Sequence, residues 1–181
     1  IIRAPNLKWN NLKLKNFFEE EFNSKTILIN DCNAGVLAEK FEDSGYKNIM
    51  YITISSGIGG GLILNNKLFL GDDFSSAEIG HLVVEPDGKK CVCGNRGCLQ
   101  AYCSGKALYS DFKKCFSDKL DEKQVLMKLF ASNDELINKN LEGSFKKLAH
   151  LITIFSGLLD VKTFRLGGGM MNFDDKILMY L

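Results

Sequence analysis

The stretch EIGHLVVEPDGKKCVCGNRGCLQ, Glu78 to Gln100, concentrates one histidine and three cysteines in a loop rich in glycine and polar residues. Thiolates and imidazoles suit Zn²⁺, and three sulfurs with one nitrogen complete a closed tetrahedral structural site. The segment GNRG, residues 94–97, turns the chain back on itself, and glycine adopts the backbone angles that a tight knuckle needs. The spacing therefore predicts a zinc site formed by His81, Cys91, Cys93 and Cys98.

Neither buried thiols nor a disulfide fits these cysteines as well as a metal does. Free thiols commonly pack as small hydrophobes, but this loop is too polar and glycine-rich for a buried apolar setting. A disulfide between Cys91 and Cys93 is strained by its geometry. The remaining cysteines, Cys32, Cys103 and Cys115, are expected to be free thiols, which favours a reducing cytoplasm.

Composition excludes several classes of protein. An apolar content of 45% and a charged content of 25% are typical of a globular protein, and 181 residues allow one domain or two small ones. The net charge of +1 gives no electrostatic footprint for nucleic acid or an anionic membrane. No apolar run is long enough to cross a bilayer, and the N-terminus does not read as a signal peptide.

The first 45 residues predict a strand that leads into a helix. After a turn at Pro5–Asn6, the apolar spacing over residues 14–22 predicts a short amphipathic helix. The run TILIN, residues 26–30, reads as a buried strand, and DCNAGVLAEKFEDSG, residues 31–45, reads as a helix that ends before its last glycine. Such a strand and helix predict an α/β sheet.

Asn30 and Asp31 stand at the carboxyl end of that predicted strand, where α/β sheets bind ligands. The commonest role of an aspartate there is to cap the helix. A catalytic role is compatible with capping, because a helix N-terminus keeps a carboxylate ionised and ready to accept a proton.

Two glycine clusters are candidates for phosphate binding. MYITISS, residues 50–56, reads as a strand, and the glycines of residues 57–61 connect it to LILN and then KLFLG, which predicts a β-meander. That turn is either a tight hairpin or a phosphate loop, in which backbone N–H groups and the Ser55 and Ser56 hydroxyls approach anionic oxygens. A second strand, residues 163–166, leads into three glycines, which either face a nucleotide or serve helix–strand packing.

Helices are predicted over residues 99–117 and 122–131, in a long segment that ends near Leu158, and over residues 171–181. His150 lies beside the buried face of the long helix with no ligand partners in register. It is therefore expected to be structural.

Taken together, these segments resemble the ROK family of bacterial sugar kinases and related repressors. The resemblance extends over nearly the whole chain, with the motifs in the expected order. Its parts are RAPNLKWNNLKL (3–14), the catalytic block NDCNAG (30–35), the phosphate motif ISSGIGGGLI (54–63), the zinc signature EIGHLVVEPDGKKCVCGNRGCLQAYCSG (78–105) and the adenosine-side glycines FRLGGGMM (164–171).

The resemblance implies an α/β protein with the actin-like ATPase (ribonuclease H-like) fold, represented mostly by its second lobe. Residues 1–45 are expected to be a remnant of the N-terminal lobe that carries the catalytic block. Residues 46–181 are expected to be the C-terminal lobe with the zinc loop, incomplete at its end. The family's Asp-x-Gly-Gly-Thr phosphate loop has no counterpart here, so we expect a fragment that is inactive alone.

The resemblance also implies roles for individual residues. Asp31 is the general base that takes the proton of the attacking sugar hydroxyl, and Asn30 binds a sugar hydroxyl. The remaining sugar contacts are Glu78, His81 and Gln100, and the nucleotide contacts are Ser56, Gly57, Gly59, Gly167, Gly168 and Gly169. The zinc is structural, His81 uses one ring nitrogen on it, and the cosubstrate is ATP with Mg²⁺.

Two positions depart from the family pattern. Gln100 stands where the family usually has glutamate, so an amide that both accepts and donates replaces a carboxylate. Ser56 replaces the usual threonine and keeps the hydroxyl. The first change affects the preference among sugars more than the reaction.

The predicted function is ATP-dependent phosphorylation of a hexose, such as glucose, or of an N-acetylhexosamine. The alternative is the sugar-binding domain of a ROK-family transcriptional repressor, which needs sugar but no ATP and carries a helix-turn-helix ahead of its sugar lobe. The retained Asn30–Asp31 pair favours the kinase. Expected partners are the sugar, ATP and a second copy in a homodimer, with no membrane and, for a kinase, no nucleic acid.

Overall fold

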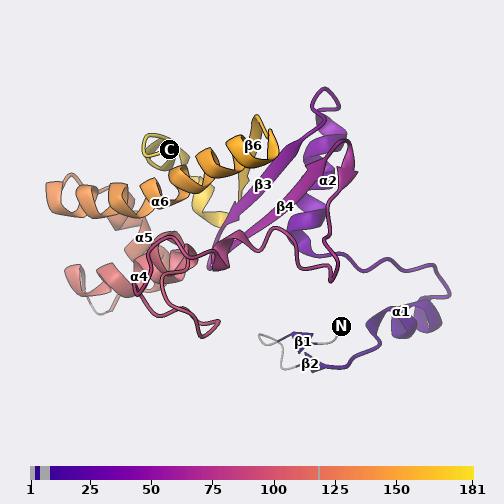
Figure 1. The fold of residues 1–181 in the computed structure, drawn as a ribbon. Coiled ribbons are helices and arrows are strands. Elements are labelled where there is room, and N and C mark those ends of the chain that lie inside the picture. Colours follow the sequence, from indigo (N-terminus) through magenta and orange to yellow (C-terminus); the bar gives the residue numbers. More distant parts are fainter. Residues whose placement is uncertain (1–2, 5–8, 118) are drawn as a thin grey trace. The chain divides into compact units, whose positions relative to one another are not determined.

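The computed structural model describes residues 3–4, 9–117 and 119–181, which fall into two compact units, Ile1–Asp31 and Cys32–Leu181 (Figure 1). The turn expected at Pro5–Asn6 lies outside the described residues. The two lobes expected at residues 1–45 and 46–181 stay a prediction.

The first unit contains little regular structure. Two short strands, β1 (Arg3–Ala4) and β2 (Trp9–Asn10), pair antiparallel. The helix α1 (Leu14–Phe22) confirms the predicted amphipathic helix and ends at Asn23, which adopts a left-handed backbone conformation. None of the α1 side chains is buried.

The strand predicted at residues 26–30 is wrong. The segment has no regular structure, and Ile27 is 78% exposed. A strand is stable only when a neighbour accepts and donates its backbone hydrogen bonds. Among the strands of the described residues none pairs with this segment, so its apolar side chains alone do not order it as a strand.

The second unit is built on a mixed sheet with the strand order β5-β4-β3-β6. β3 pairs antiparallel with β4 and parallel with β6, and β4 pairs antiparallel with β5, which confirms the predicted meander. Asn65 and Asn66 connect β4 to β5 with φ values of 51° and 63°, as a two-residue type I′ hairpin turn requires. The strand bounds are β3 (Ile49–Ile54), β4 (Ile58–Leu64), β5 (Lys67–Leu68) and β6 (Thr163–Gly167).

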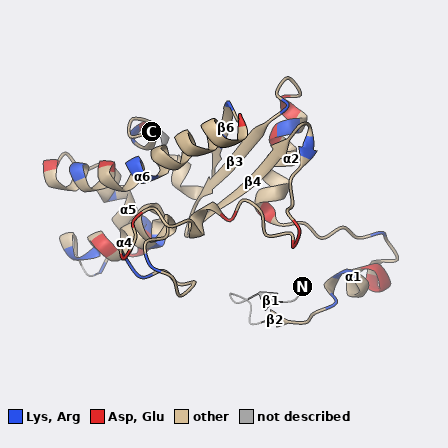
Figure 2. Cartoon of the chain, in the orientation of Figure 1, with Lys and Arg blue, Asp and Glu red and all other residues tan. Residues whose placement is uncertain are grey.

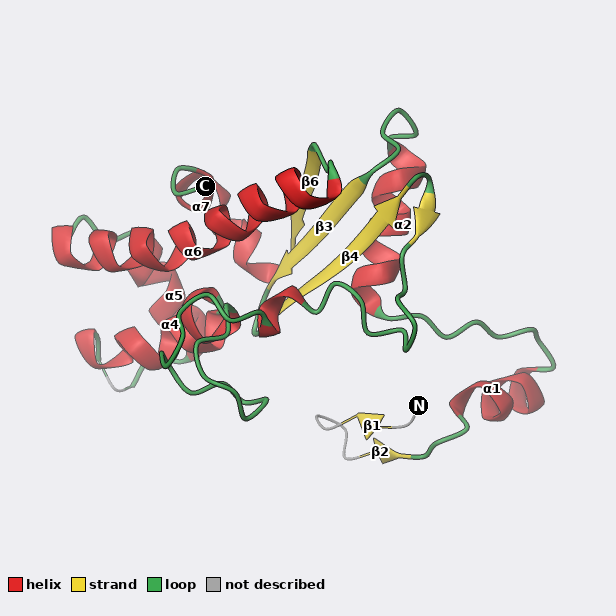
Figure 3. Ribbon diagram, in the orientation of Figure 1, coloured by secondary structure: helices red, strands yellow, loops and turns green. Residues whose placement is uncertain are grey.

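Alternate residues of β3 face two different layers. Met50, Ile52 and Ile54 belong to the main core, which the helices α3 to α6 complete on one face of the sheet. Ile49 belongs to a smaller cluster with Val36 of α2 (Asp31–Glu42), the helix on the other face (Figure 3). The period-2 alternation thus gives a three-layer α/β/α arrangement.

The glycines of β4 let α2 approach the sheet closely. A Cβ on Gly59 would lie 2.6 Å from Cys32 Sγ, and one on Gly61 would lie 2.3 Å from the Cys32 carbonyl oxygen. The glycines at these positions therefore belong to a strand, whereas the prediction placed the whole run 57–61 in a turn. Only Ser55, Ser56 and Gly57 form the β3–β4 turn.

The helices follow the predicted order, with one break. The helix expected over residues 99–117 is interrupted at Ser104, whose hydroxyl accepts a hydrogen bond from the Ala107 N–H at 3.2 Å and begins a new helix. His150 is exposed on α6. The bounds are α3 (Gln100–Cys103), α4 (Gly105–Phe112), α5 (Glu122–Phe130), α6 (Glu135–Leu159), α7 (Asp174–Leu178) and the 3-10 helices η2 (Ile79–His81), η3 (Lys113–Cys115) and η4 (Gly169–Phe173).

Charges of both signs are interspersed along α4, α5 and α6 (Figure 2), as the net charge of +1 leads one to expect. In the described part of the chain, no helix combines the length and apolar character needed to cross a membrane.

Candidate functional site: a cysteine–histidine metal centre and a neighbouring cavity

The four predicted metal ligands lie together in the second unit. Their ligand atoms are all within 4.8 Å of one another, with Cys91 Sγ 3.8 Å from His81 Nδ1 and Cys93 Sγ 3.7 Å from Cys98 Sγ. Nδ1 is therefore the ring nitrogen on the side of the sulfurs. His81 ends η2, and the cysteines come from the knuckle, which we define as residues 85–98.

The donor set fits zinc. Ligands at typical Zn–S and Zn–N distances in a tetrahedron are separated from one another by about 3.6–3.8 Å, close to both of the distances above. One imidazole and three thiolates leave no open position, so this centre would be structural. The other three cysteines, Cys32, Cys103 and Cys115, lie outside the cluster and form no disulfide.

The pKa values of two cysteines of the cluster are shifted in opposite directions. Burial acts to raise the pKa of Cys91, but hydrogen bonds from the Cys93 backbone, the Gln100 amide and His81 outweigh it and lower that pKa to about 6. Burial raises the pKa of Cys98 to about 12, and the adjacent Cys91 and Cys93 act in the same direction. One thiolate therefore forms readily at neutral pH, whereas Cys98 keeps its proton until a metal displaces it.

Backbone hydrogen bonds fold the knuckle tightly. The Cys91 N–H donates to the Asn95 carbonyl at 2.8 Å, and the Gly97 N–H donates to the Lys89 carbonyl at 2.8 Å. Gly97 has φ of 76°, and a Cβ there would lie 1.8 Å from the Glu85 carbonyl oxygen. Glycine is thus required at position 97 for both its conformation and its size.

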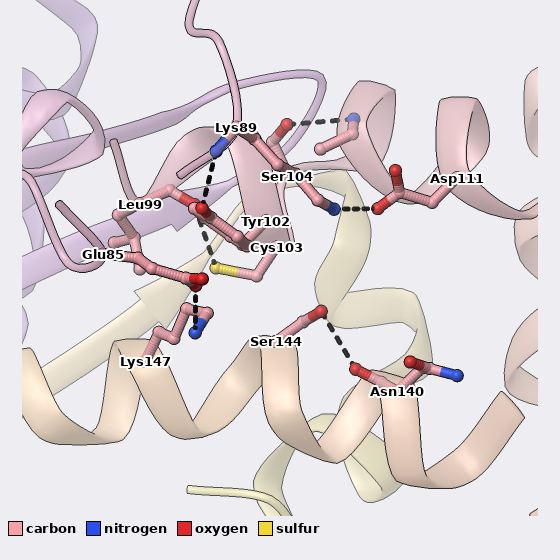
Figure 4. A network of polar contacts seen from close by, with 11 residues as sticks. Glu85, Lys89, Leu99, Tyr102, Cys103, Ser104, Asp111, Asn140, Ser144 and Lys147 are labelled. Atoms are coloured by element: carbon pink, nitrogen blue, oxygen red, sulfur yellow. Dashed lines mark hydrogen bonds and ion pairs between the residues drawn. The ribbon is translucent and has the colours of Figure 1, made fainter. Parts of the chain in front are cut away.

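A polar network centred on Tyr102 of α3 braces the knuckle (Figure 4). The Tyr102 hydroxyl accepts the Lys89 N–H at 2.8 Å, and the ammonium groups of Lys89 and Lys147 lie 5.0 and 4.9 Å from the centroid of its ring. Lys147 of α6 pairs with Glu85 at 2.8 Å and, together with the Tyr102 hydroxyl, lowers the pKa of that carboxyl. Lys89 also pairs with Asp111 of α4. The knuckle is therefore tied to three helices.

The substitution Tyr102→Phe tests this brace. Tyr102 is 6% exposed, and loss of its hydroxyl leaves the Lys89 N–H without that acceptor, so we expect the free energy of unfolding to fall by about 1–3 kcal/mol. Chemical denaturation of the metal-loaded protein measures the change. Tyr109→Phe on α4 is the matched control, expected within about 0.5 kcal/mol of the parent. Equal effects of the two variants would contradict a bracing role for Tyr102.

The predicted sugar contacts of the second unit flank the metal centre. Gln100 is the first residue of α3, and its Nε2 donates to Cys91 Sγ at 3.4 Å. Glu78 is exposed and immediately precedes η2, which ends in His81. The knuckle thus connects Glu78 and His81 on one side to Gln100 on the other, and their sugar-binding roles stay a prediction.

The chain has a cavity of about 630 Å³ beside the β3–β4 turn. Two of the predicted nucleotide contacts, Ser56 and Gly169, line it, and Ser55 lies beside them. The wall is largely apolar, with a few polar groups at its edge, as is typical of a cofactor or small-molecule site. Its other lining residues are Gly105, Glu122, Lys123, Leu126, Met127, Met170, Asn172 and Phe173.

The remaining predicted nucleotide glycines lie outside this lining. Gly57 ends the β3–β4 turn, Gly59 lies in β4 and contacts α2, and Gly167 and Gly168 end β6 and begin the turn after it. For Gly59 the structure shows a position inside β4 packed against Cys32, rather than the hairpin turn that was the alternative to a phosphate loop. A nucleotide role for these glycines stays a prediction.

Asp31 and Asn30 belong to the end of the first unit. Asp31 is the first residue of α2 and the acidic residue of its first turn, where the partial positive charge of the helix terminus stabilises a carboxylate. Both residues are exposed. A place in the first turn of α2 is compatible with a proton-accepting role, and that role stays a prediction.

Sequence reasoning missed two features of the site. Tyr102 was absent from the predicted residues, although it follows the candidate ligand Cys98 by only four residues. The apolar wall of the cavity, from Leu126 and Met127 of α5 and Phe173 of η4, also had no signal, because these side chains follow the ordinary apolar pattern of core helices.

Comparisons with known proteins identify the family. The model of the ROK family matches residues 1–179. The xylose repressor of Bacillus spizizenii is 44% identical over 110 residues, which cover 60% of this chain and 29% of the repressor. An N-acetylmannosamine kinase of Haemophilus influenzae (strain 86-028NP) is 36% identical over 147 residues, which cover 79% of this chain and 48% of the kinase.

A solved structure agrees. The crystal structure of a ROK family glucokinase from Streptomyces griseus in complex with glucose and AMPPNP superposes with a TM-score of 0.81 at 27% identity, covering 99% of this chain and 64% of that protein. The chain spans less than two thirds of each of these three relatives. Its α/β architecture is that of the actin-like ATPase fold of ROK kinases. The chain therefore belongs to the ROK family.

Proposed function

We propose that this chain is part of an ATP-dependent sugar kinase that phosphorylates a hexose or an N-acetylhexosamine. The observation that carries the proposal is the 630 Å³ cavity, which has the size and apolar wall that a nucleobase and ribose need. Its edge is formed by the serines of the β3–β4 turn and by Gly169 after β6. The Streptomyces griseus relative, solved with glucose and AMPPNP, supports a nucleotide at this fold.

In this proposal Asp31 is the general base. Phosphoryl transfer depends mainly on positioning and charge stabilisation, so one aligned carboxylate, hydrogen-bond donors to the phosphates and Mg²⁺ suffice. Asn30, Glu78, His81 and Gln100 hold the sugar, and Ser56 donates its hydroxyl to a phosphate. The zinc acts only by holding the knuckle and the His81 ring in place.

The second candidate function is the sugar-binding domain of a transcriptional repressor. It is favoured by the 44% identity to a xylose repressor, which exceeds the identity to the N-acetylmannosamine kinase. A repressor of this kind needs the sugar contacts and the metal centre but not the nucleotide cavity. Nucleotide binding therefore separates the two functions.

We also propose that the protein acts in the cytoplasm and forms a homodimer. No disulfide forms among the six cysteines, which supports a reducing compartment, where ATP is also available.

Binding of AMPPNP, measured by isothermal titration calorimetry on the full-length protein, tests the kinase. We expect the parent to bind AMPPNP and the variant Met127→Asp to bind it at least about tenfold more weakly. The variant places a carboxylate in the apolar wall of the cavity, where a charge is costly to bury and repels the nucleotide phosphates. Met127 is 53% exposed, so the variant should fold; Met179→Asp, at a site 81% exposed and outside the cavity lining, is the control. Consumption of ATP is then screened with hexoses and N-acetylhexosamines. Sugar binding without AMPPNP binding would favour the repressor.

A further inference from the structure

Gln100 contacts two parts of the second unit at once. Its side chain is half-buried, and its Nε2 donates to Cys91 Sγ at 3.4 Å. At the other end of the same amide, Oε1 lies beside the β3–β4 turn. A Cβ added to Gly57 of that turn would be 3.4 Å from this oxygen. The carboxamide therefore spans the distance between a metal ligand and the turn that borders the cavity.

The chemistry of the sulfur decides which way this amide points. A thiolate bound to a metal has lone pairs and no proton, so it can only accept a hydrogen bond. The amide nitrogen must then face Cys91, and the carbonyl oxygen must face away from it toward Gly57. An ionised carboxylate has no proton to donate, so the glutamate that is usual in the family at this position cannot make this contact.

We propose that Gln100 is a positioning residue of the metal centre, which holds the Cys91 thiolate by an N–H···S hydrogen bond and is itself oriented by it. Two consequences follow. The sulfur gains a donor that partly neutralises its charge, which strengthens the retention of the metal. The amide oxygen is fixed as an uncharged acceptor beside the β3–β4 turn; where the proposed function holds, the sugar meets this single neutral acceptor.

Metal affinity tests the hydrogen bond without any sugar or nucleotide. Zinc is titrated against a competing chelator in the full chain, in Gln100→Met, which keeps the length of the side chain but removes the donor, and in Gln100→Glu. We expect affinity to fall about 10–100-fold in both variants, the range found for outer-shell partners, because neither side chain can donate to Cys91. Asn95→Asp is the matched control, because it adds a carboxylate to the exposed part of the same knuckle.

A spectroscopic measurement separates the hydrogen bond from a general loss of structure. With Co²⁺ in place of zinc, the sulfur-to-cobalt charge-transfer band reports the energy of the sulfur lone pairs, which a hydrogen bond lowers. We expect the band to move to longer wavelength in Gln100→Met and in Gln100→Glu, and to stay in place in Asn95→Asp. An unchanged band and unchanged zinc affinity in Gln100→Met would overturn the proposal.

These results stand independently of the catalytic proposal. Absence of AMPPNP binding or of phosphorylation would remove the kinase function but leave the metal affinity and the cobalt spectrum unaffected. Conversely, an unchanged cobalt spectrum in an active kinase would remove only the role of Gln100 at Cys91.

Discussion

Replacing Asp31 by asparagine is expected to lower kcat for sugar phosphorylation by about 10²–10⁴-fold, the usual contribution of a general base. The amide is isosteric with the carboxylate but cannot accept the proton of the sugar hydroxyl as that oxygen attacks phosphorus. Asp31 is the first residue of α2, and asparagine occupies the same volume there, so the fold should be preserved. The dissociation constant of the sugar should change little.

The measurement is steady-state kinetics of the full-length protein, with sugar binding followed separately by calorimetry. Glu42→Gln is the matched control, because it removes an exposed carboxylate from the last turn of the same helix. We expect the control to keep the activity of the parent. Full turnover in Asp31→Asn would remove this residue as the base and shift the proton-accepting role elsewhere.

Replacing Cys98 by serine should abolish metal binding. The parent is expected to hold about one zinc per chain, and the serine variant close to none, since a neutral hydroxyl is a poor ligand beside two thiolates. Cys98 is fully buried, so the vacated centre also leaves polar groups without their partner. At a free metal concentration about 1,000 times the dissociation constant, the metal contributes about 4 kcal/mol, or roughly 8–16 °C in melting temperature.

The affinity of the centre should also depend on pH with a defined sign. Because the pKa of metal-free Cys98 is about 12, zinc displaces at least this one proton throughout the neutral range, so affinity rises by at least about tenfold per pH unit. Below a pH of about 6, Cys91 is also protonated and the dependence steepens. The stability that the metal confers is therefore lost as pH falls.

Elemental analysis and thermal melts in the presence and absence of a chelator measure both effects. Cys115→Ser is the control, because Cys115 is exposed and lies outside the four-ligand cluster. Equal zinc content in Cys98→Ser and in the parent would contradict the assignment of this ligand. A melting temperature unaffected by the chelator would contradict a structural role for the metal.

The convergence of the four candidate metal ligands could be predicted because three of them are close in sequence. Cys91, Cys93 and Cys98 lie within one short loop, so spacing alone brings their sulfurs together, and His81 follows from the preceding turn. The β-meander was predictable for a similar reason, since Asn65 and Asn66 both favour the positive φ of a type I′ turn. In each case local residues determine local geometry.

The errors arose where distant segments decide the structure. Residues 26–30 have the composition of a strand, but composition does not supply a partner strand. Gly59 and Gly61 read as a loop because glycine is common in turns, whereas in the fold they make room for the side chain and backbone of Cys32 in α2. The cavity wall was equally hidden, since Leu126 and Phe173 meet only after the helices pack. The bracing role of Tyr102 was hidden for the same reason, because Lys89 and Lys147 reach its ring only in the folded chain.

The central position of β3 has a consequence for how the chain folds. Its pairing with β4 is local and joins residues across a three-residue turn, so this hairpin can form within microseconds. Its pairing with β6 joins Ile49 to Thr163 and must close a loop that contains the knuckle and helices α3 to α6. The entropic cost of that closure is offset only when the helices have packed on the sheet. We therefore expect β6 to be the last strand to dock and its docking to limit the folding rate.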